Sequence, residues 1–517
     1  MSAITPQTEI RLLKCPIESD NRNQITFANA TAQYNYFNGL PKLIVDGCTY
    51  LRADSVIRYP EHIDNIIRYN YVMYQNEAYT NKWFYAFITK MDYINDNMTA
   101  IHIEQDVFQT WQFDMVWKAS FVEREHVSVA NDTLGANTVP EGLEHGEYKV
   151  QSHLMDSVNG DVTIILGTSE DYLDDYNTKV HVYGGIPAPL TYYRYDGPSL
   201  STIQSVLGAL NQGKADTIVS LFLAPKWLTS FVGTTVQVAD SATPASTTLG
   251  ISRISTLDGY TPKNKKLLCF PYCYIALSNA VGAYNIYHQE DWALTSNEMK
   301  LKMYGTLVNG CSIKAVPQNY KGNDEAFDES LTIGKFPSLA WANDVYTNWL
   351  TQNGVNVLGV PIDATTTGVI AGGVTATAGL LTGNAIATMG GIGTILGTLK
   401  EDYRHDMIPA SIRGSLNSGD VNNGKGINRL HAYRVTIKQE YARIIDDFFT
   451  MYGYKINRVK TPNLNTRSNW NYVKTIGANI EGDIPEEYLN KIKAIFNNGV
   501  TLWHTTTYYL DYSRTNS

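Results

Sequence analysis

Trp83-Phe-Tyr-Ala-Phe-Ile88, followed by Asn95-Asp-Asn97 and then by Thr99-Ala-Ile-His-Ile-Glu104, is the stretch that best indicates the fold of this chain. Two runs rich in aromatic and β-branched residues are separated by polar residues that favour turns, which is the pattern of a β-hairpin. A later passage, Pro271-Tyr-Cys-Tyr-Ile-Ala-Leu277, has the same pattern, since it breaks at Ser278-Asn279 and resumes at Tyr284-Asn-Ile-Tyr-His288. The sequence therefore predicts a chain built mainly from strands.

The composition is typical of a large β-rich protein. The chain has 517 residues, enough for about three domains. Hydrophobic residues make up 44%, which excludes a disordered chain. Charged residues reach only 18%, and 35 Tyr stand against 15 Phe, so uncharged polar side chains must supply much of the surface. A net charge of −9 argues against a protein that grips nucleic acid through a basic face.

The five cysteines do not form the pattern of a disulfide framework. Their number is odd and they are thinly spread. Cys269-Phe-Pro-Tyr-Cys273 matches no common zinc or redox spacing, so we interpret these cysteines as small buried hydrophobic residues. The first 20 residues carry charges and no apolar core of a signal peptide, so we expect synthesis and folding in a cytoplasm.

The sequence contains no recognisable catalytic, cofactor or metal motif of the common kinds. Glu123-Arg-Glu-His126 and Glu144-His-Gly-Glu147 each set two carboxylates beside a histidine, as a fragment of an acid/base or metal site would. On a strand, however, neighbouring side chains point to opposite faces. We therefore assign no catalytic residue, no cofactor and no metal, and expect a protein that is not an enzyme.

Negative charge is concentrated between residues 120 and 175, which contain twelve Asp or Glu and only two basic residues, Arg124 and Lys149. Two interpretations stay open. The segment is either an ordinary solvated face or a surface that repels a polyanion.

The most unusual segment is 364–399, which contains no Asp, Glu, Lys, Arg, His, Pro or aromatic residue among its 36 residues. One interpretation is a buried structural element, but a helix of 36 residues would measure about 54 Å, too long for most domain interiors. The nine glycines also argue against strands. The other interpretation, which we favour, is a membrane-active segment, because a bilayer span needs about 20 apolar residues.

Thr382-Gly-Asn384 is a natural turn between two arms, residues 364–381 and 385–399. Three glycine pairs have the spacing that lets helices approach closely. The candidate turn and helix-contact glycines are Gly368, Gly372, Gly379, Gly383, Gly393 and Gly397. The candidate membrane-inserting side chains are Val369, Ile370, Val374, Leu380, Leu381, Ile386, Ile392, Ile395, Leu396 and Leu399. The many threonines make the segment less apolar than a permanent transmembrane helix, as suits a piece that is stored and inserted later.

Two further elements follow this segment. Residues 413–426 are rich in Gly, Ser and Asn and are predicted to form a flexible tether. After them, Ile437, Tyr441, Ile444, Ile445, Phe448 and Tyr452 recur at helical spacing, which predicts an amphipathic helix that ends at Gly453.

Several passages of the chain resemble the tail knob, or distal tail tube, protein of small short-tailed phages that infect Gram-positive bacteria. The most specific is Asp446-Asp-Phe-Phe-Thr-Met-Tyr-Gly-Tyr454 with Asn457-Arg-Val-Lys-Thr-Pro-Asn463. The others are Trp83-Phe-Tyr-Ala-Phe-Ile88, Asp106-Val-Phe-Gln-Thr-Trp-Gln-Phe-Asp114 with Phe121-Val-Glu-Arg-Glu-His126, Gly184-Gly-Ile-Pro-Ala-Pro-Leu190 and Asn498-Gly-Val-Thr-Leu-Trp-His504.

This resemblance implies a mainly β (α+β) fold, a tail-tube-like β-barrel ring subunit with a long hydrophobic Gly/Thr-rich loop insertion. It also implies a homohexameric tube at the distal end of the tail, through which DNA leaves without specific binding. A hydrophobic loop, here about residues 355–426, would plug the tube and then penetrate the host membrane. The implied partners are further copies of the chain, the upper tail or collar proteins of the virion, and the host cell membrane.

We expect four parts: an N-terminal β tube domain (1–165), a second β domain (166–350), the loop with its tether (351–430), and a C-terminal segment that completes the tube body (431–517). Three rival functions remain. A wall-degrading tail enzyme would need an essential carboxylate, and a receptor-binding adhesin would bind glycans without membrane leakage. A secreted pore-forming toxin would need an export signal, and none is visible.

Overall fold

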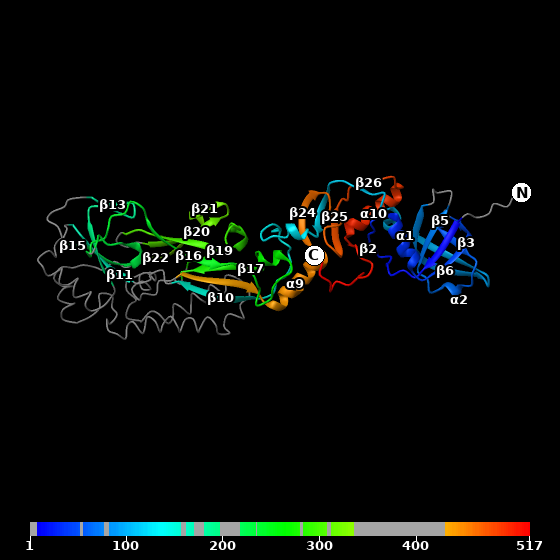
Figure 1. The fold of residues 1–517 in the computed structure, drawn as a ribbon, viewed down its shortest axis with the longest axis horizontal. Helices are drawn as coiled ribbons and strands as arrows, with labels where there is room; N and C mark the ends of the chain where they lie inside the picture. The colour runs from blue at the N-terminus through cyan, green and yellow to red at the C-terminus, as the bar shows by residue number, and fades with distance from the viewer. Residues whose placement is uncertain are drawn as a thin grey trace. The chain divides into compact units, whose positions relative to one another are not determined.

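The computed structural model describes residues 8–51, 55–76, 82–156, 162–169, 180–196, 218–233, 235–279, 283–307, 312–335 and 430–517 (Figure 1). The chain divides into two compact units. Unit 1 comprises Met1–Leu143 and Ile444–Ser517, and unit 2 comprises Glu144–Arg443. Strands predominate in both, so the predicted fold class is confirmed.

The N-terminal part of unit 1 forms a closed six-stranded barrel. Its strands, in the order in which they pair around the barrel, are β1 (Thr8–Leu13), β3 (Lys42–Leu51), β4 (Val56–Tyr59), β7 (Met98–Gln105), β6 (Trp83–Asn95) and β5 (Tyr71–Asn76). The predicted hairpin is confirmed as the antiparallel pair β6–β7, which closes with Asn95 opposite Met98. Strand β6 is longer than the aromatic run and continues to Asn95.

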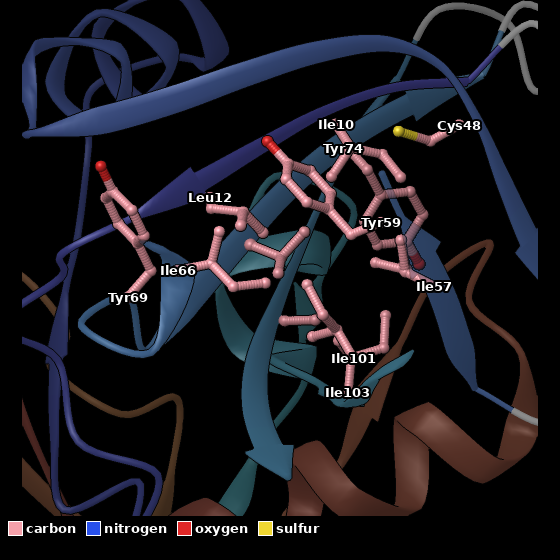
Figure 2. Packing of buried hydrophobic residues seen from close by; sticks show 12 residues of the cluster. Ile10, Leu12, Cys48, Ile57, Tyr59, Ile66, Tyr69, Tyr74, Ile101 and Ile103 are labelled. Carbon is pink, nitrogen blue, oxygen red and sulfur yellow. The ribbon is translucent and has the colours of Figure 1, made fainter. Parts of the chain in front are cut away.

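The barrel interior is a packed apolar core. Alternate residues of β1, Ile10 and Leu12, point inward and meet Ile57 from β4 and Ile101 from β7, all fully buried (Figure 2). Tyr59 lies among them. Because strand side chains alternate between faces, each strand fills the interior with every second residue. The barrel is therefore a solid body and not a channel.

The second sheet of unit 1 joins the beginning and the end of the chain. Its order is β2 (Asn23–Ile25), β27 (Val500–Trp503), β25 (Trp470–Ile476), β9 (Ser120–Glu125) and β24 (Tyr454–Lys460). Strand β2 runs parallel to β27, and β9 lies between β24 and β25. Trp470 and Trp503, both fully buried, pack with ring centroids 5.1 Å apart. A two-stranded sheet is formed by β8 (Val116–Trp117), which precedes β9 in the chain, and β26 (Ile480–Glu481), which follows β25.

Helices of unit 1 include α1 (Ala30–Gly39), α2 (Ile63–Ile66), α3 (Val107–Trp111) and α10 (Glu486–Asn498). Sequence analysis missed α10, although Pro485 precedes it and two glutamates occupy its first turn, both ordinary signals of a helix start. Its face of Ile492, Ile495 and Phe496 packs in one apolar cluster with Val107 and Phe108 of α3.

Helix α9 (Gln439–Tyr452) confirms the predicted amphipathic helix and its end at Gly453. The predicted buried face was wrong in part. Ala442, Ile445 and Phe449 are buried, whereas Ile444 is 67% exposed. Phe449 packs edge to face against Tyr454, just beyond the end of the helix.

Unit 2 consists of several smaller antiparallel sheets. The first has the order β10 (Tyr148–Asp156), β23 (Leu430–Ile437), β17 (Cys273–Ser278) and β18 (Tyr284–Tyr287), and it contains the second predicted hairpin as β17–β18. The second has the order β14 (Thr191–Asp196), β11 (Val162–Thr168) and β15 (Ile218–Pro225). A third has the order β16 (Ala245–Ser252), β19 (Glu298–Gly305), β20 (Ser312–Tyr320) and β21 (Asn323–Glu325), with β22 (Leu331–Lys335) also on β20. The pair β12 (His181–Tyr183) and β13 (Ile186–Ala188) completes the unit.

Within the described ranges, no helix combines the length and the apolar character that crossing a bilayer requires. The cysteines that fall in these ranges, Cys15, Cys48, Cys269 and Cys273, are free and buried, as the sequence indicated.

Gly453 provides a test of the fold. It has a φ of +65°, and a Cβ there would lie 2.2 Å from the backbone oxygen of Glu125. We expect Gly453→Ala to lower the free energy of unfolding by about 3 kcal/mol or more, because backbone strain and a clash with an immobile strand add together. Chemical denaturation of the full chain measures this loss.

Gly477→Ala is the matched control. Gly477 also has a positive φ, +73°, but a Cβ there would meet no atom within 4 Å. Only the strain of about 1–2 kcal/mol should appear. Equal losses in the two variants would contradict the close approach of Gly453 to β9.

Candidate functional site

The predicted membrane-active segment lies outside the described residues. This holds for the tether at 413–426 and for every candidate side chain within 364–399. They are the apolar residues Val369, Ile370, Val374, Leu380, Leu381, Ile386, Ile392, Ile395, Leu396 and Leu399, and the glycines Gly368, Gly372, Gly379, Gly383, Gly393 and Gly397. The described structure does contain the two strands from which this insertion leaves and to which it returns.

Strands β22 and β23 flank the insertion, and both are tied to the end of β17. His431 of β23 pairs with Ser278 of β17. The next residue, Asn279, donates its side-chain amide to the carbonyl oxygen of Thr332 in β22, at 2.9 Å. The strand before the insertion and the strand after it therefore contact two consecutive residues, Ser278 through its backbone and Asn279 through its side chain.

Strand β23 is a rigid attachment for the end of the insertion. It is bonded on one side to β10 and on the other to β17, and seven of its eight residues are buried. Arg434, the half-buried exception, donates to the Ser152 hydroxyl at 2.5 Å. A strand that is hydrogen-bonded on both edges is released only if the sheet itself opens. The sheet therefore holds the start of β23, at Leu430, in place.

A pair of histidines lies at the start of β23, the strand that follows the insertion. His153 Nε2 and His431 Nδ1 lie 2.9 Å apart in coplanar rings, and the Tyr433 ring stacks on His153 at 4.7 Å. Burial lowers the pKa of His153. At this distance one of the two ring nitrogens donates a hydrogen bond to the other.

The Glu123-Arg-Glu-His126 cluster is part of the fold and does not form an open site. Glu125 is 1% exposed, accepts from Lys460 Nζ at 2.5 Å, and accepts from the backbone N–H of Asn463 at 2.7 Å. Arg124 bonds to Glu141. His126 accepts at Nδ1 from the N–H of Tyr472 at 2.7 Å, while its Nε2 lies 3.0 Å from the carbonyl oxygen of Thr450.

The Glu144-His-Gly-Glu147 cluster does not converge on one point either. Glu147 pairs with Lys438, the His145 ring contacts Tyr148, and the Glu144 side chain is exposed. Over the stretches that the structure describes, no three His, Cys, Asp or Glu side chains are arranged to hold a metal ion.

The acidic segment is partly neutralised by later parts of the chain. Glu123 pairs with Lys474 at 2.9 Å, Glu125 with Lys460, and Glu147 with Lys438. Sequence spacing could not reveal these pairs, because more than 290 residues separate each pair of partners. These three carboxylates are therefore part of intramolecular ion pairs and do not add uncompensated charge to the surface.

The buried ionisable groups make unit 1 sensitive to acid. Burial, with smaller effects from Arg467 and Arg124, lowers the pKa of His126 to about 3, and burial lowers the pKa of His504 to about 4. Both are held neutral in the folded state. Burial raises the pKa of Asp106, which caps α3 and accepts from Tyr71, to about 6.

These shifts act in opposite directions as the pH falls. An unfolded histidine gains a proton below about pH 6.5 and the folded one does not, so each histidine's stabilising contribution is lost from pH 6.5 downward. Asp106 has the reverse effect, because its folded carboxyl takes up a proton near pH 6, before the unfolded one does. Between pH 7 and pH 5 each histidine removes about 2 kcal/mol and Asp106 returns about 1 kcal/mol.

We therefore expect the urea midpoint of the full chain, followed by tryptophan fluorescence, to fall between pH 7 and pH 5. His126→Asn should reduce this pH dependence by about 2 kcal/mol, whatever it does to stability at pH 7. A pH dependence equal in the wild-type chain and in the His126→Asn variant would show that His126 is not held neutral.

The family model for the C-terminal domain of tail knob protein gp9 of Bacillus phage phi29 matches residues 239–517. The model for the N-terminus of caudoviral major tail proteins matches residues 6–118, a range that contains all six barrel strands.

Individual relatives agree with these families. The chain is 27% identical to tail knob protein gp9 of Bacillus phage phi29 and 29% identical to that of Bacillus phage PZA, with 96% of each chain covered in both comparisons. The structure of tail knob protein gp12 of bacteriophage C1 matches with a TM-score of 0.63 over 98% of both chains, at 16% identity, which speaks for the fold alone. Since the gp9 model spans more than half of the sequence, the resemblance seen in the sequence is confirmed, and the chain belongs to the tail knob proteins, structural components of phage tails.

Proposed function

We propose that this chain is a subunit of a hexameric tail-tip tube whose hydrophobic insertion plugs the tube and then penetrates the host membrane during DNA ejection. One observation carries the proposal. A tail knob body contains, between β22 and β23, 36 consecutive residues without a charged, aromatic or proline residue. Such a segment has no obvious role in a tube wall, whereas it suits a lipid environment.

The length of the segment supports two short spans. Each arm, 364–381 and 385–399, is close to the lower limit of about 17 residues for a membrane helix. Nine threonines supply hydroxyl groups that line water better than leucines do. Six copies of two arms would give about twelve helices, enough to surround an aqueous lumen if the threonine faces turn inward.

The attachment of the insertion supports release without unfolding. Both flanking strands are held at Ser278-Asn279, and β23 is paired along both edges. The closing of a long loop costs free energy that grows only slowly with its length, so the insertion can rearrange while its ends stay fixed. The body of the protein then keeps its shape while the apolar segment moves from a stored to an inserted position.

Charge supports a passive role toward DNA. The net charge of −9 and the low charged fraction leave little attraction for a polyanion, as a conduit requires. In this proposal the chain is made in the host cytoplasm and assembled at the distal end of the tail. Its partners are five further copies, upper tail or collar proteins, and finally the host membrane.

We also propose that the role is not enzymatic. The carboxylates of Glu125 and Glu147, which sequence spacing set beside histidines, are engaged by Lys460 and Lys438. A wall-degrading function would need a carboxylate free to reach a substrate. Clearing of a suspension of bacterial walls by the pure protein would overturn this part of the proposal.

The membrane role predicts the effect of charge in the segment. Leu380→Asp combined with Ile395→Asp should allow assembly but abolish dye release from liposomes, because a carboxylate near the centre of a bilayer costs about 3 kcal/mol for each residue. Light scattering checks assembly, and a self-quenched dye reports leakage.

Asn417→Asp combined with Asn422→Asp adds the same charge within the predicted tether and is the matched control. It should leak as the wild-type chain does. Undiminished leakage by the Leu380→Asp, Ile395→Asp chain would contradict the proposal.

A further inference from the structure

Unit 1 contains a polar cleft of about 900 Å³. It lies between the turn before β2, the end of β7, strand β25 and the C-terminal half of α10. The proposals for the insertion make no use of this cleft. Its volume is within the range of sites that hold a ligand of several rings.

Two tyrosines form an aromatic wall in the cleft. The rings of Tyr452 and Tyr472 meet at 83° with centroids 5.1 Å apart. Among the described residues, neither hydroxyl has a hydrogen-bond partner. Burial raises the pKa of Tyr472, so its hydroxyl is a neutral group that can both donate and accept. Two aromatic rings and two hydroxyl groups without a hydrogen-bond partner among the described residues therefore belong to the lining of one cleft.

The turn after α10 is shaped around this hydroxyl. Gly499 has a φ of +92°, and a Cβ there would lie 2.2 Å from the oxygen of Tyr472. Only glycine fits this conformation and this approach. The preceding residue, Asn498, is exposed and lines the same cleft, and its amide group has both donor and acceptor atoms.

The charges in the cleft compensate one another. Arg22 pairs with Asp20 at 3.6 Å. Lys491 pairs with Glu104 at 3.9 Å and with Glu487 of its own helix at 3.6 Å. A polyphosphate or nucleic acid requires a site with excess positive charge, which these pairs do not provide. The cleft thus favours an uncharged ligand with many hydroxyl groups.

We propose that this cleft binds a neutral oligosaccharide. The apolar face of a sugar ring would pack on the tyrosine wall, and its hydroxyl groups would bond to the tyrosine hydroxyls and to Asn498. Rings with a polar tip are suited to a ligand that has an apolar face and a polar edge. The inference is independent of the membrane role, since none of these residues belongs to the insertion.

The test is a titration of the assembled full-length protein with chitotetraose, a neutral tetrasaccharide, followed by saturation-transfer NMR and calorimetry. The wild-type chain should bind. Tyr472→Phe and Asn498→Ala, which each remove one hydrogen-bonding group, should weaken binding about five- to tenfold. Tyr93→Phe is the matched control. Tyr93 is an exposed tyrosine of β6 whose hydroxyl bonds to Asp96, and removing that hydroxyl should change nothing.

Liposome leakage, measured in parallel, should be the same in all four proteins, so failure here is distinct from failure of the membrane role. Absence of sugar binding by the wild-type chain, or equal binding by all variants, would overturn the proposal. Binding of inorganic polyphosphate that Tyr472→Phe weakens would overturn the class of ligand. Sugar binding by dissociated chains alone would show that another copy covers the cleft in the assembly, and would also overturn it.

Discussion

A buried carboxylate strengthens the connection between the N-terminal and C-terminal parts of unit 1. Glu125 lies on β9, between β24 and β25, and its bonds run to Lys460 and Asn463, more than 330 residues away. Removing one partner of a buried ion pair costs about 3–5 kcal/mol, because the other charge is left without compensation. Unit 1 therefore depends on the C-terminal segment, and in the sequence unit 2 lies between the two parts of unit 1.

This arrangement has a consequence for the insertion. Residues 336–429 belong to unit 2, and the strands on either side of them, β22 and β23, are hydrogen-bonded within that unit. The described strands of the barrel of unit 1 and of the sheet around Glu125 all come from other parts of the chain. The proposed function requires that the apolar segment changes its position while the barrel core and the Glu125 contacts stay unaltered, and this separation in the chain is consistent with that requirement.

The sequence predicted those features that depend on local patterns. The hairpins β6–β7 and β17–β18 follow from aromatic runs interrupted by Asn, Asp or Ser, and the end of α9 follows from Gly453. Features that depend on distant partners could not be predicted. The buried face of α9 depends on tertiary contacts such as that of Phe449 with Tyr454, and the ion pair of Glu125 with Lys460 joins residues that no sequence pattern connects. Helix α10 could have been predicted, because Pro485 followed by Glu486 and Glu487 is an ordinary sequence signal for the start of a helix.

The most direct test of the account is the depth of the insertion in a bilayer. A fluorophore is attached to Leu380→Cys, or to Asn417→Cys in the tether, in a chain that also carries Cys311→Ser; the other four cysteines are buried. Liposomes then carry quenchers on their acyl chains. The account predicts that, when the liposomes leak, the label at position 380 is quenched and the label at position 417 is not. Leakage with an unquenched label at position 380 would contradict it.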